Sequence, residues 1–236
     1  MDHVATAPAT LPEGQRIYAI GDVHGCAGRL LGLHRRIIAD LAARPVARPV
    51  VVHLGDFVDR GPDSAAVIDA LAGLPSLGGA PVVNLRGNHE EMMLAAMADP
   101  SAVDIWLYNG GLASLSSWEV PPGTPSAQWP SSVPADHLAF LNSLRLSWAA
   151  GPYFFAHAGV RPGIPLARQA PHDLLWIREP FLGSSADFGA VVVHGHTPQP
   201  DPVIRPNRLG IDTGAVLGGK LTCAVLEGNR IGFLFG

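Results

Sequence analysis

Hydrophobic and polar positions follow two different periods in the first hundred residues. Short apolar runs predict strands at residues 16–22 and 80–88, and a continuous apolar run predicts a strand at residues 49–56. Apolar residues spaced three or four positions apart predict helices at residues 27–44, 63–74 and 90–98. Alternating strands and helices predict a parallel sheet with right-handed crossovers, and the continuous apolar strand at residues 49–56 predicts that both faces of the sheet are covered.

The pattern changes in the second half of the chain. Residues 120–134 are rich in Pro and Ser and predict a surface loop, and residues 135–146 predict one more helix. Short strands separated by Gly and Pro turns are then expected within "GPYFFAHAG", "GAVVVHGHT", "RLGIDTGAV" and "KLTCAVLEGNRIGFLFG". The last segment predicts a hairpin that turns at Gly228–Asn229. We expect residues 1–15 to form a flexible tail and residues 16–236 to form a single domain.

Three polar motifs occupy equivalent places in this pattern. "GDVHG" (21–25), "GDFVDRG" (55–61) and "GNHE" (87–90) each follow a predicted strand and precede a predicted helix. They are therefore expected at the carboxyl ends of neighbouring strands, which is where open α/β sheets bind ligands. Carboxylates, imidazoles and an amide oxygen suit divalent transition metals, and their number suggests two ions that share one carboxylate. The motifs supply Asp22, His24, Asp56, Asp59, Arg60, Asn88 and His89.

Composition narrows the functional class. The chain has 236 residues, of which 47% are hydrophobic, enough for one sizeable core. A net charge of -4 without a Lys/Arg block argues against a nucleic-acid partner. Two cysteines, Cys26 and Cys223, make neither a disulfide framework nor a zinc spacing. Because we see no signal peptide and no apolar run of about 20 residues, we expect a cytoplasmic protein without a membrane partner.

Taken together, the ordered motifs Asp-x-His, Gly-Asp-x-Val-Asp-Arg-Gly and Gly-Asn-His-Glu resemble those of the calcineurin-like metallophosphoesterases. More narrowly, they resemble those of the bacterial PPP-type serine/threonine protein phosphatases, over roughly residues 16–227. The resemblance implies a four-layer α/β/β/α sandwich, with a β-α-β-α-β first half and a strand-rich second half. It also implies that residues 100–150 shape the mouth through which the substrate enters.

The resemblance assigns a ligand set for two divalent metal ions. Manganese is expected by resemblance, and iron and zinc suit the same donors. Asp56 and a hydroxide that acts as the nucleophile would bridge the two ions. Many phosphodiesterases of the superfamily have a further His ligand where this chain has Pro198, so that ligand is expected to be missing here. His196 is the expected ligand, and His194 is expected to have a supporting or structural role. The first ion would take Asp22, His24 and Asp56, and the second Asp56, Asn88, His157 and His196.

The resemblance also assigns catalytic roles. Arg60, and Arg178 in "LLWIRE", would hold the phosphoryl oxygens, because guanidinium groups match them bidentately. His89 would protonate the leaving alkoxide as general acid, and Asp59 would orient its ring. The implied substrate is a phosphoserine or phosphothreonine protein, with phosphotyrosine and small phosphate esters as further possibilities. The alternative is a symmetrical bis(5'-nucleosyl)-tetraphosphate hydrolase, a related class that tends to lack an acid at the position of Asp59.

Overall fold

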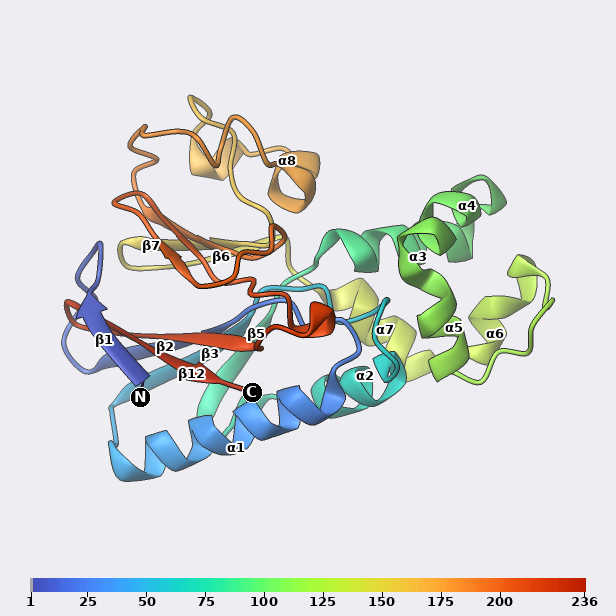
Figure 1. Ribbon diagram of the computed structural model, residues 1–236, viewed down its shortest axis with the longest axis horizontal. Helices are drawn as coiled ribbons and strands as arrows, with labels where there is room; N and C mark the ends of the chain where they lie inside the picture. The colour runs from blue at the N-terminus through green and yellow to red at the C-terminus, as the bar shows by residue number, and fades with distance from the viewer. Residues whose placement is uncertain (1) are drawn as a thin grey trace.

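The computed structural model describes residues 2–236 and consists of two facing β-sheets flanked by helices (Figure 1). One sheet has seven strands in the order β1-β12-β11-β2-β3-β5-β4, and the other has five in the order β6-β7-β8-β10-β9. The first sheet comprises β1 (Asp2–Thr6), β2 (Gln15–Ile20), β3 (Arg48–His53), β4 (Ser76–Leu77), β5 (Ala80–Asn84), β11 (Thr222–Glu227) and β12 (Arg230–Phe235). The second comprises β6 (Ser147–Ala150), β7 (Tyr153–Ala156), β8 (Val191–His194), β9 (Val203–Ile204) and β10 (Arg208–Gly210).

The predicted β-α units form the centre of the first sheet. Strands β2, β3 and β5 are parallel, and α1 (Ala27–Ala43) and α2 (Ser64–Ala72) cover the outer face (Figure 1). Strand β2 is apolar at successive positions because both of its faces are buried: Tyr18 packs with the helices, whereas Ile17 packs between the sheets. The predicted hairpin is also present, since Glu227 pairs with Arg230 across Gly228 and Asn229.

The expectation that residues 1–15 form a flexible tail is wrong. Residues 2–6 form β1, which pairs antiparallel with β12, the strand that would otherwise be the edge of the sheet. The amide groups of Ala7 and Leu11 then donate to the carbonyls of Asn229 and Gly228. Leu11 is buried in the core between the sheets. The Ala, Thr and Pro composition concealed a strand that depends on this distant partner.

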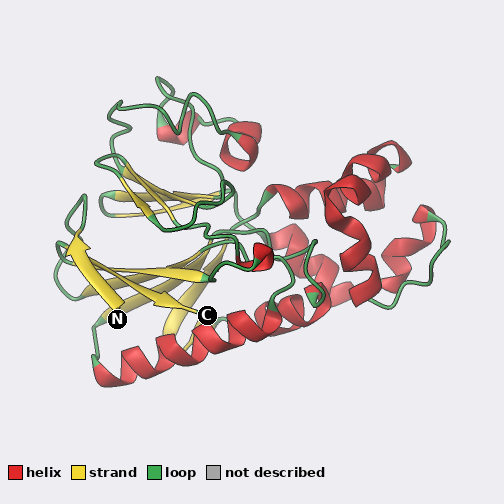
Figure 2. Ribbon diagram, in the orientation of Figure 1, coloured by secondary structure: helices red, strands yellow, loops and turns green. Residues whose placement is uncertain are grey.

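The second sheet completes the predicted four layers. Strands β7, β8 and β10 are parallel, and β6 and β9 flank them in antiparallel pairings that the sequence pattern did not indicate. Tyr153 and Phe155 pack against the first sheet, and Phe154 faces outward toward a cluster that contains Leu174 of α8 (Pro171–Trp176). Figure 2 shows the two sheets stacked between helical segments, which confirms the α/β/β/α arrangement.

A helical arm, residues 100–143, extends beyond the sheets beside α3 (Asn88–Ala98) (Figure 1). The predicted loop at 120–134 contains two short helical segments, and the predicted helix at 135–146 is shorter than expected. Within residues 2–236, no helix is long and apolar enough to span a membrane. The arm contains α4 (Val103–Trp106), the π-helical turn η2 (Leu107–Gly111), α5 (Leu112–Ser117), the 3-10 turn η3 (Ser126–Gln128), α6 (Trp129–Ser132) and α7 (Ala135–Ser143).

Candidate metal centre

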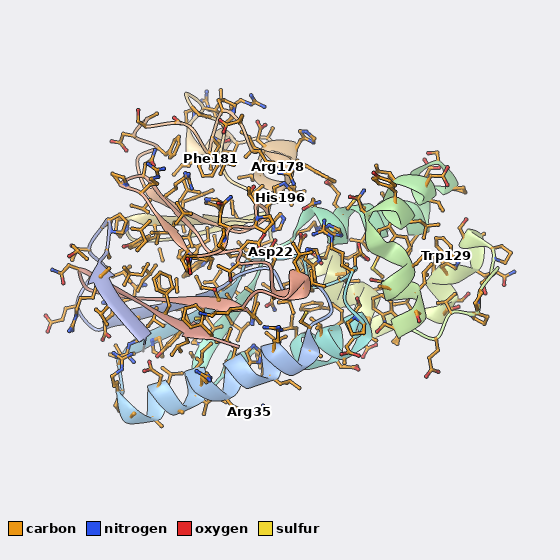
Figure 3. The ribbon with its side chains drawn as sticks, viewed as in Figure 1. Asp22, Arg35, Trp129, Arg178, Phe181 and His196 are labelled. Atoms are coloured by element: carbon orange, nitrogen blue, oxygen red, sulfur yellow. The ribbon has the colours of Figure 1, made fainter. Side chains whose placement is uncertain are left out.

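The predicted ligands meet at the carboxyl ends of strands from both sheets. Asp22 follows β2, Asp56 follows β3, and Asn88 begins the helix after β5. From the second sheet, His157 follows β7 and His196 follows β8. All five side chains are buried, and Figure 3 shows Asp22 and His196 at the ends of the strands, with Arg178 next to His196. The fold therefore brings the ligand set together as the motifs predict.

The loops that carry these side chains have an unusual backbone. His24, Asp56 and His196 have φ values of 43°, 51° and 64°, in the left-handed region that non-glycine residues seldom adopt. The neighbouring glycines leave room for the carboxylates: a Cβ atom at Gly195 would overlap Asp22, and one at Gly87 would overlap Asp56. Such strained loops persist where the surrounding structure holds them, and they cluster at functional sites.

Asp56 lies between imidazoles from the two sheets. Its Oδ2 atom is 3.4 Å from His24 Nε2 and 3.4 Å from His157 Nε2. The Nδ1–H group of His24 donates to the Val58 carbonyl at 2.9 Å, and that of His157 donates to the Leu54 carbonyl at 3.0 Å. These bonds fix the ring orientations and direct both Nε2 atoms toward Asp56, an arrangement typical of histidine metal ligands.

The other predicted ligands lie around the imidazoles of His24 and His157. Asn88 Oδ1 is 2.9 Å from His157 Nε2 and 3.0 Å from His196 Nδ1. Asp22 Oδ2 accepts the backbone N–H of His196 at 2.9 Å, across 174 positions of sequence. The donor atoms of Asp56, His157 and His196 lie within 4.8 Å of one another, and so do those of His24, Asp56 and His89.

Unpaired buried atoms test whether metal ions fit this site. In the described chain, residues 2–236, Asp22 Oδ1, His89 Nε2 and His196 Nε2 are buried without a protein hydrogen-bond partner. Because Asp56 belongs to both clusters of donor atoms, the residues fit two cations that share its carboxylate. The first cluster contains His89 where Asp22 was expected, and Asn88 joins the second cluster through its contacts with His157 and His196.

The electrostatics of the site favour the binding of cations. Burial raises the pKa of the Asp22 carboxyl, and the nearby Asp212 and Asp56 raise it further. Burial raises the pKa of Asp212 to about 6. Burial lowers the pKa of His24 and of His196 to about 3, so both rings are neutral at pH 7, as metal ligands must be.

Asp212 is a site residue that the sequence analysis missed. It follows β10 as the expected ligands follow their own strands, and it is buried beside Asp22. The sequence signal was present, because "RLGIDTGAV" places an Asp directly after a predicted strand. The same rule that selected Asp22 and Asp56 would have selected it.

Next to the predicted ligands lie His89, the expected general acid, and Asp59, which is expected to orient its ring. His89 Nδ1 is 2.8 Å from Asp59 Oδ2, and both side chains are buried. Burial lowers the pKa of His89, but the Asp56 and Asp59 carboxylates outweigh burial and raise it above its ordinary value. Arg60 and Arg178 are exposed, and the Arg60 Nη1 group is 3.0 Å from His24 Nε2. Both guanidinium groups are therefore available at the edge of the site.

Glu90 joins the second and third motifs. Its carboxylate accepts the backbone N–H groups of Asp56, Phe57, Val58 and Gly87 at distances of 2.7–3.2 Å. The residue is fully buried and comes directly after His89. It therefore holds the loops of the second and third motifs together, a role that its place in "GNHE" did not indicate.

Comparisons with known proteins agree with this geometry. The chain matches the calcineurin-like phosphoesterase family over residues 15–236. It is 30% identical to "Serine/threonine-protein phosphatase 1" of Salmonella typhimurium, over 90% of this chain and 93% of that protein. It is 27% identical to "Bis(5'-nucleosyl)-tetraphosphatase, symmetrical" of Bordetella pertussis, over 91% of this chain and 94% of that protein. A crystal structure described as a putative diadenosine tetraphosphatase superposes with a TM-score of 0.67 at 23% identity, covering 98% of each chain.

The chain belongs to the calcineurin-like phosphoesterases. The resemblance seen in the motifs is thereby confirmed, and so is the fold class. Members of this family use a binuclear metal centre, and the two clusters that share Asp56 are groups of described residues that could hold it.

Proposed function

We propose that this chain is a binuclear-metal phosphomonoester hydrolase that acts on phosphoserine and phosphothreonine in proteins. The observation that carries the proposal is the buried His89–Asp59 pair beside Asp56, with an Nδ1 to Oδ2 distance of 2.8 Å. An alkoxide is a poor leaving group, so hydrolysis of its phosphate ester benefits from a positioned proton donor. The similarity to a serine/threonine phosphatase over 90% of the chain supports the same assignment.

The metal ligands in this proposal are those that the motifs predict, with two Mn²⁺ ions as the expected occupants and Fe or Zn as alternatives. When bound, such ions polarise phosphoryl oxygens and supply an activated water. We assign Asp56 as the shared ligand. The other ligands are Asp22, His24, Asn88, His157 and His196.

The other residues act on the substrate. Arg60 and Arg178, both exposed at the edge of the site, would bind the phosphoryl oxygens. His89 would donate its Nε2 proton to the leaving oxygen, while Asp59 keeps the Nδ1 side of the ring fixed. Since His89 Nε2 has no hydrogen-bond partner among residues 2–236, that nitrogen can serve as the donor.

The second candidate is symmetrical hydrolysis of a dinucleoside tetraphosphate. It is favoured by the 27% identity to the Bordetella pertussis tetraphosphatase over 91% of this chain. Its leaving group is a nucleotide phosphate, which departs without needing a proton. The buried Asp59–His89 pair would then lack a catalytic purpose, which is why we prefer the first candidate.

The deciding experiment compares phosphate release from a phosphoserine/phosphothreonine peptide with cleavage of a dinucleoside tetraphosphate, using protein stripped by chelator and restored with Mn²⁺. We expect the peptide to be the better substrate. We also expect His89→Asn to lower kcat on the peptide by about 10²–10⁴-fold. Turnover of the nucleotide alone would contradict the first candidate and support the second.

A further inference from the structure

The carboxylate of Asp59 accepts hydrogen bonds from three side chains. His89 Nδ1 lies 2.8 Å from Oδ2. Trp106 Nε1 lies 3.0 Å from both carboxylate oxygens, and the Ser114 hydroxyl lies 2.6 Å from Oδ1. Trp106 belongs to α4 and Ser114 to α5, so two of the three donors come from the helical arm rather than from the strand ends.

A second serine fixes the direction of this network. The hydroxyl groups of Ser64 and Ser114 are 3.0 Å apart, and both accept the backbone N–H of Asp59. Because the single Ser114 proton goes to Asp59 Oδ1, Ser64 must donate to Ser114. The chain from Ser64 through Ser114 to Asp59 is therefore polarised toward the carboxylate, which strengthens each bond in it.

We propose that Trp106 and Ser114 are positioning residues for the general acid. This inference rests on the proposed function, because it assumes that His89 donates a proton. With one oxygen held by Ser114 and both bridged by the Trp106 N–H, the carboxylate plane cannot rotate away from His89. The donors also stabilise the ionised carboxylate against the cost of its complete burial.

The contacts of the helical arm extend from Asp59 to the adjacent arginine. The backbone N–H of Arg60 donates to the Gly110 carbonyl at 3.3 Å, and a Cβ atom at Gly110 would collide with the Arg60 side chain. Asp59 and Arg60 both have left-handed backbones, with φ values of 72° and 67°. The helical arm therefore contacts both Asp59, which is hydrogen-bonded to the general acid His89, and Arg60, which would bind the phosphoryl oxygens.

Leaving-group dependence separates this role from general structural support. A phosphoserine peptide releases a basic alkoxide that needs a proton, whereas 2,4-dinitrophenyl phosphate releases an anion that does not. We expect Trp106→Phe and Ser114→Ala each to lower kcat on the peptide by about tenfold, a fraction of the full effect of general acid catalysis. On the dinitrophenyl ester we expect a change below about twofold, because no proton is needed there.

The helical arm supplies matched controls. Trp129→Phe removes an indole N–H that donates to the Thr124 carbonyl. The ring of Trp129 packs on that of Trp106, with centroids 5.6 Å apart, so this control lies in the same part of the arm. Ser117→Ala removes a hydroxyl from the same helix as Ser114, one that accepts the backbone N–H of Ala65. Neither group contacts Asp59, so neither control should change the ratio of the two rates. Bound Mn²⁺ and Tm are measured for every variant.

The benchmark variant His89→Asn makes the outcomes distinguishable. If it loses much more activity on the peptide than on the dinitrophenyl ester while Trp106→Phe and Ser114→Ala behave like their controls, the positioning role is overturned and the acid role stands. Equal losses on both substrates in the Trp106 and Ser114 variants would also overturn the positioning role, as would a loss of bound metal. If His89→Asn shows no leaving-group dependence, both the acid role and this inference fail.

Discussion

At their carboxyl ends the parallel strands of the two sheets gather buried like charges, whereas opposite charges pair near the amino end of β2. Asp22, Asp56 and Asp212 lie together, and the first and last have raised pKa values. At the other end, Asp40 and Glu227 face arginines at distances down to 2.6 Å, and their pKa values are lowered. One end therefore costs stability unless cations bind, while the other contributes stability directly.

At the amino end, the charged groups find partners within the chain. Arg16 is almost fully buried, yet its guanidinium donates to Glu227, to the Tyr18 hydroxyl and to the Arg44 carbonyl. At the carboxyl end, by contrast, buried polar atoms such as Asp22 Oδ1 lack protein partners among residues 2–236. Buried polar atoms without protein partners in this range, on loops with left-handed backbone, therefore indicate that the functional site lies at the carboxyl ends of the strands.

The largest effect should follow from removing the shared carboxylate. We expect Asp56→Asn to lower phosphatase activity by more than about 10³-fold, beyond the roughly 10–100-fold cost of losing a residue that only supports a ligand. Bound Mn²⁺, measured by elemental analysis, should fall for both ions together. Loss of one ion with the other retained at full occupancy would contradict the assignment of Asp56 as the bridging ligand.

A smaller effect, on thermal stability, is expected when the negative charge of Asp212 beside Asp22 is removed. Asp212→Asn keeps an oxygen for the Gly214 N–H but removes the charge beside Asp22. The raised pKa of about 6 means that the folded state binds the Asp212 proton more tightly than the unfolded state. The wild-type protein therefore loses stability from this group as pH rises from the ordinary carboxyl pKa through about 6.

The measurement is the Tm of chelator-treated wild type and Asp212→Asn between pH 5 and 8. At pH 8 we expect the variant to melt a few degrees higher, the shift that about 1 kcal/mol gives in a chain of this size. The difference should shrink as pH falls through about 6, because the wild-type carboxyl becomes protonated. If the variant melts at a lower temperature than wild type at pH 8, the charge of Asp212 does not destabilise the folded protein.

The two ends also differ in how far the sequence predicts them. Asp22, Asp56 and Asn88 could be placed because each lies at the carboxyl end of a predicted strand, and parallel strands bring their ends together. Arg16 and Glu227 are paired across 211 positions, and no local spacing marks such a pair. Trp106 was unpredictable for the same reason, since its contact with Asp59 depends on how the helical arm packs.

The smallest effect should come from the amino end. Glu227→Gln removes one partner of Arg16 in a carboxylate that is 28% exposed, a setting in which an ion pair is worth at most about 1 kcal/mol. We expect Tm to fall by a few degrees or less at pH 7, with kcat unchanged. The hydrogen bond from Arg16 lowers the pKa of Glu227. The contribution of Glu227 to stability should therefore be constant above the ordinary glutamate pKa and be lost as pH falls from that value through the lowered pKa of the folded state.

The control is Glu13→Gln, which removes a negative charge from an exposed position before β2. Equal Tm losses in both variants would show that net charge, rather than the Arg16 pairing, sets the stability of this end.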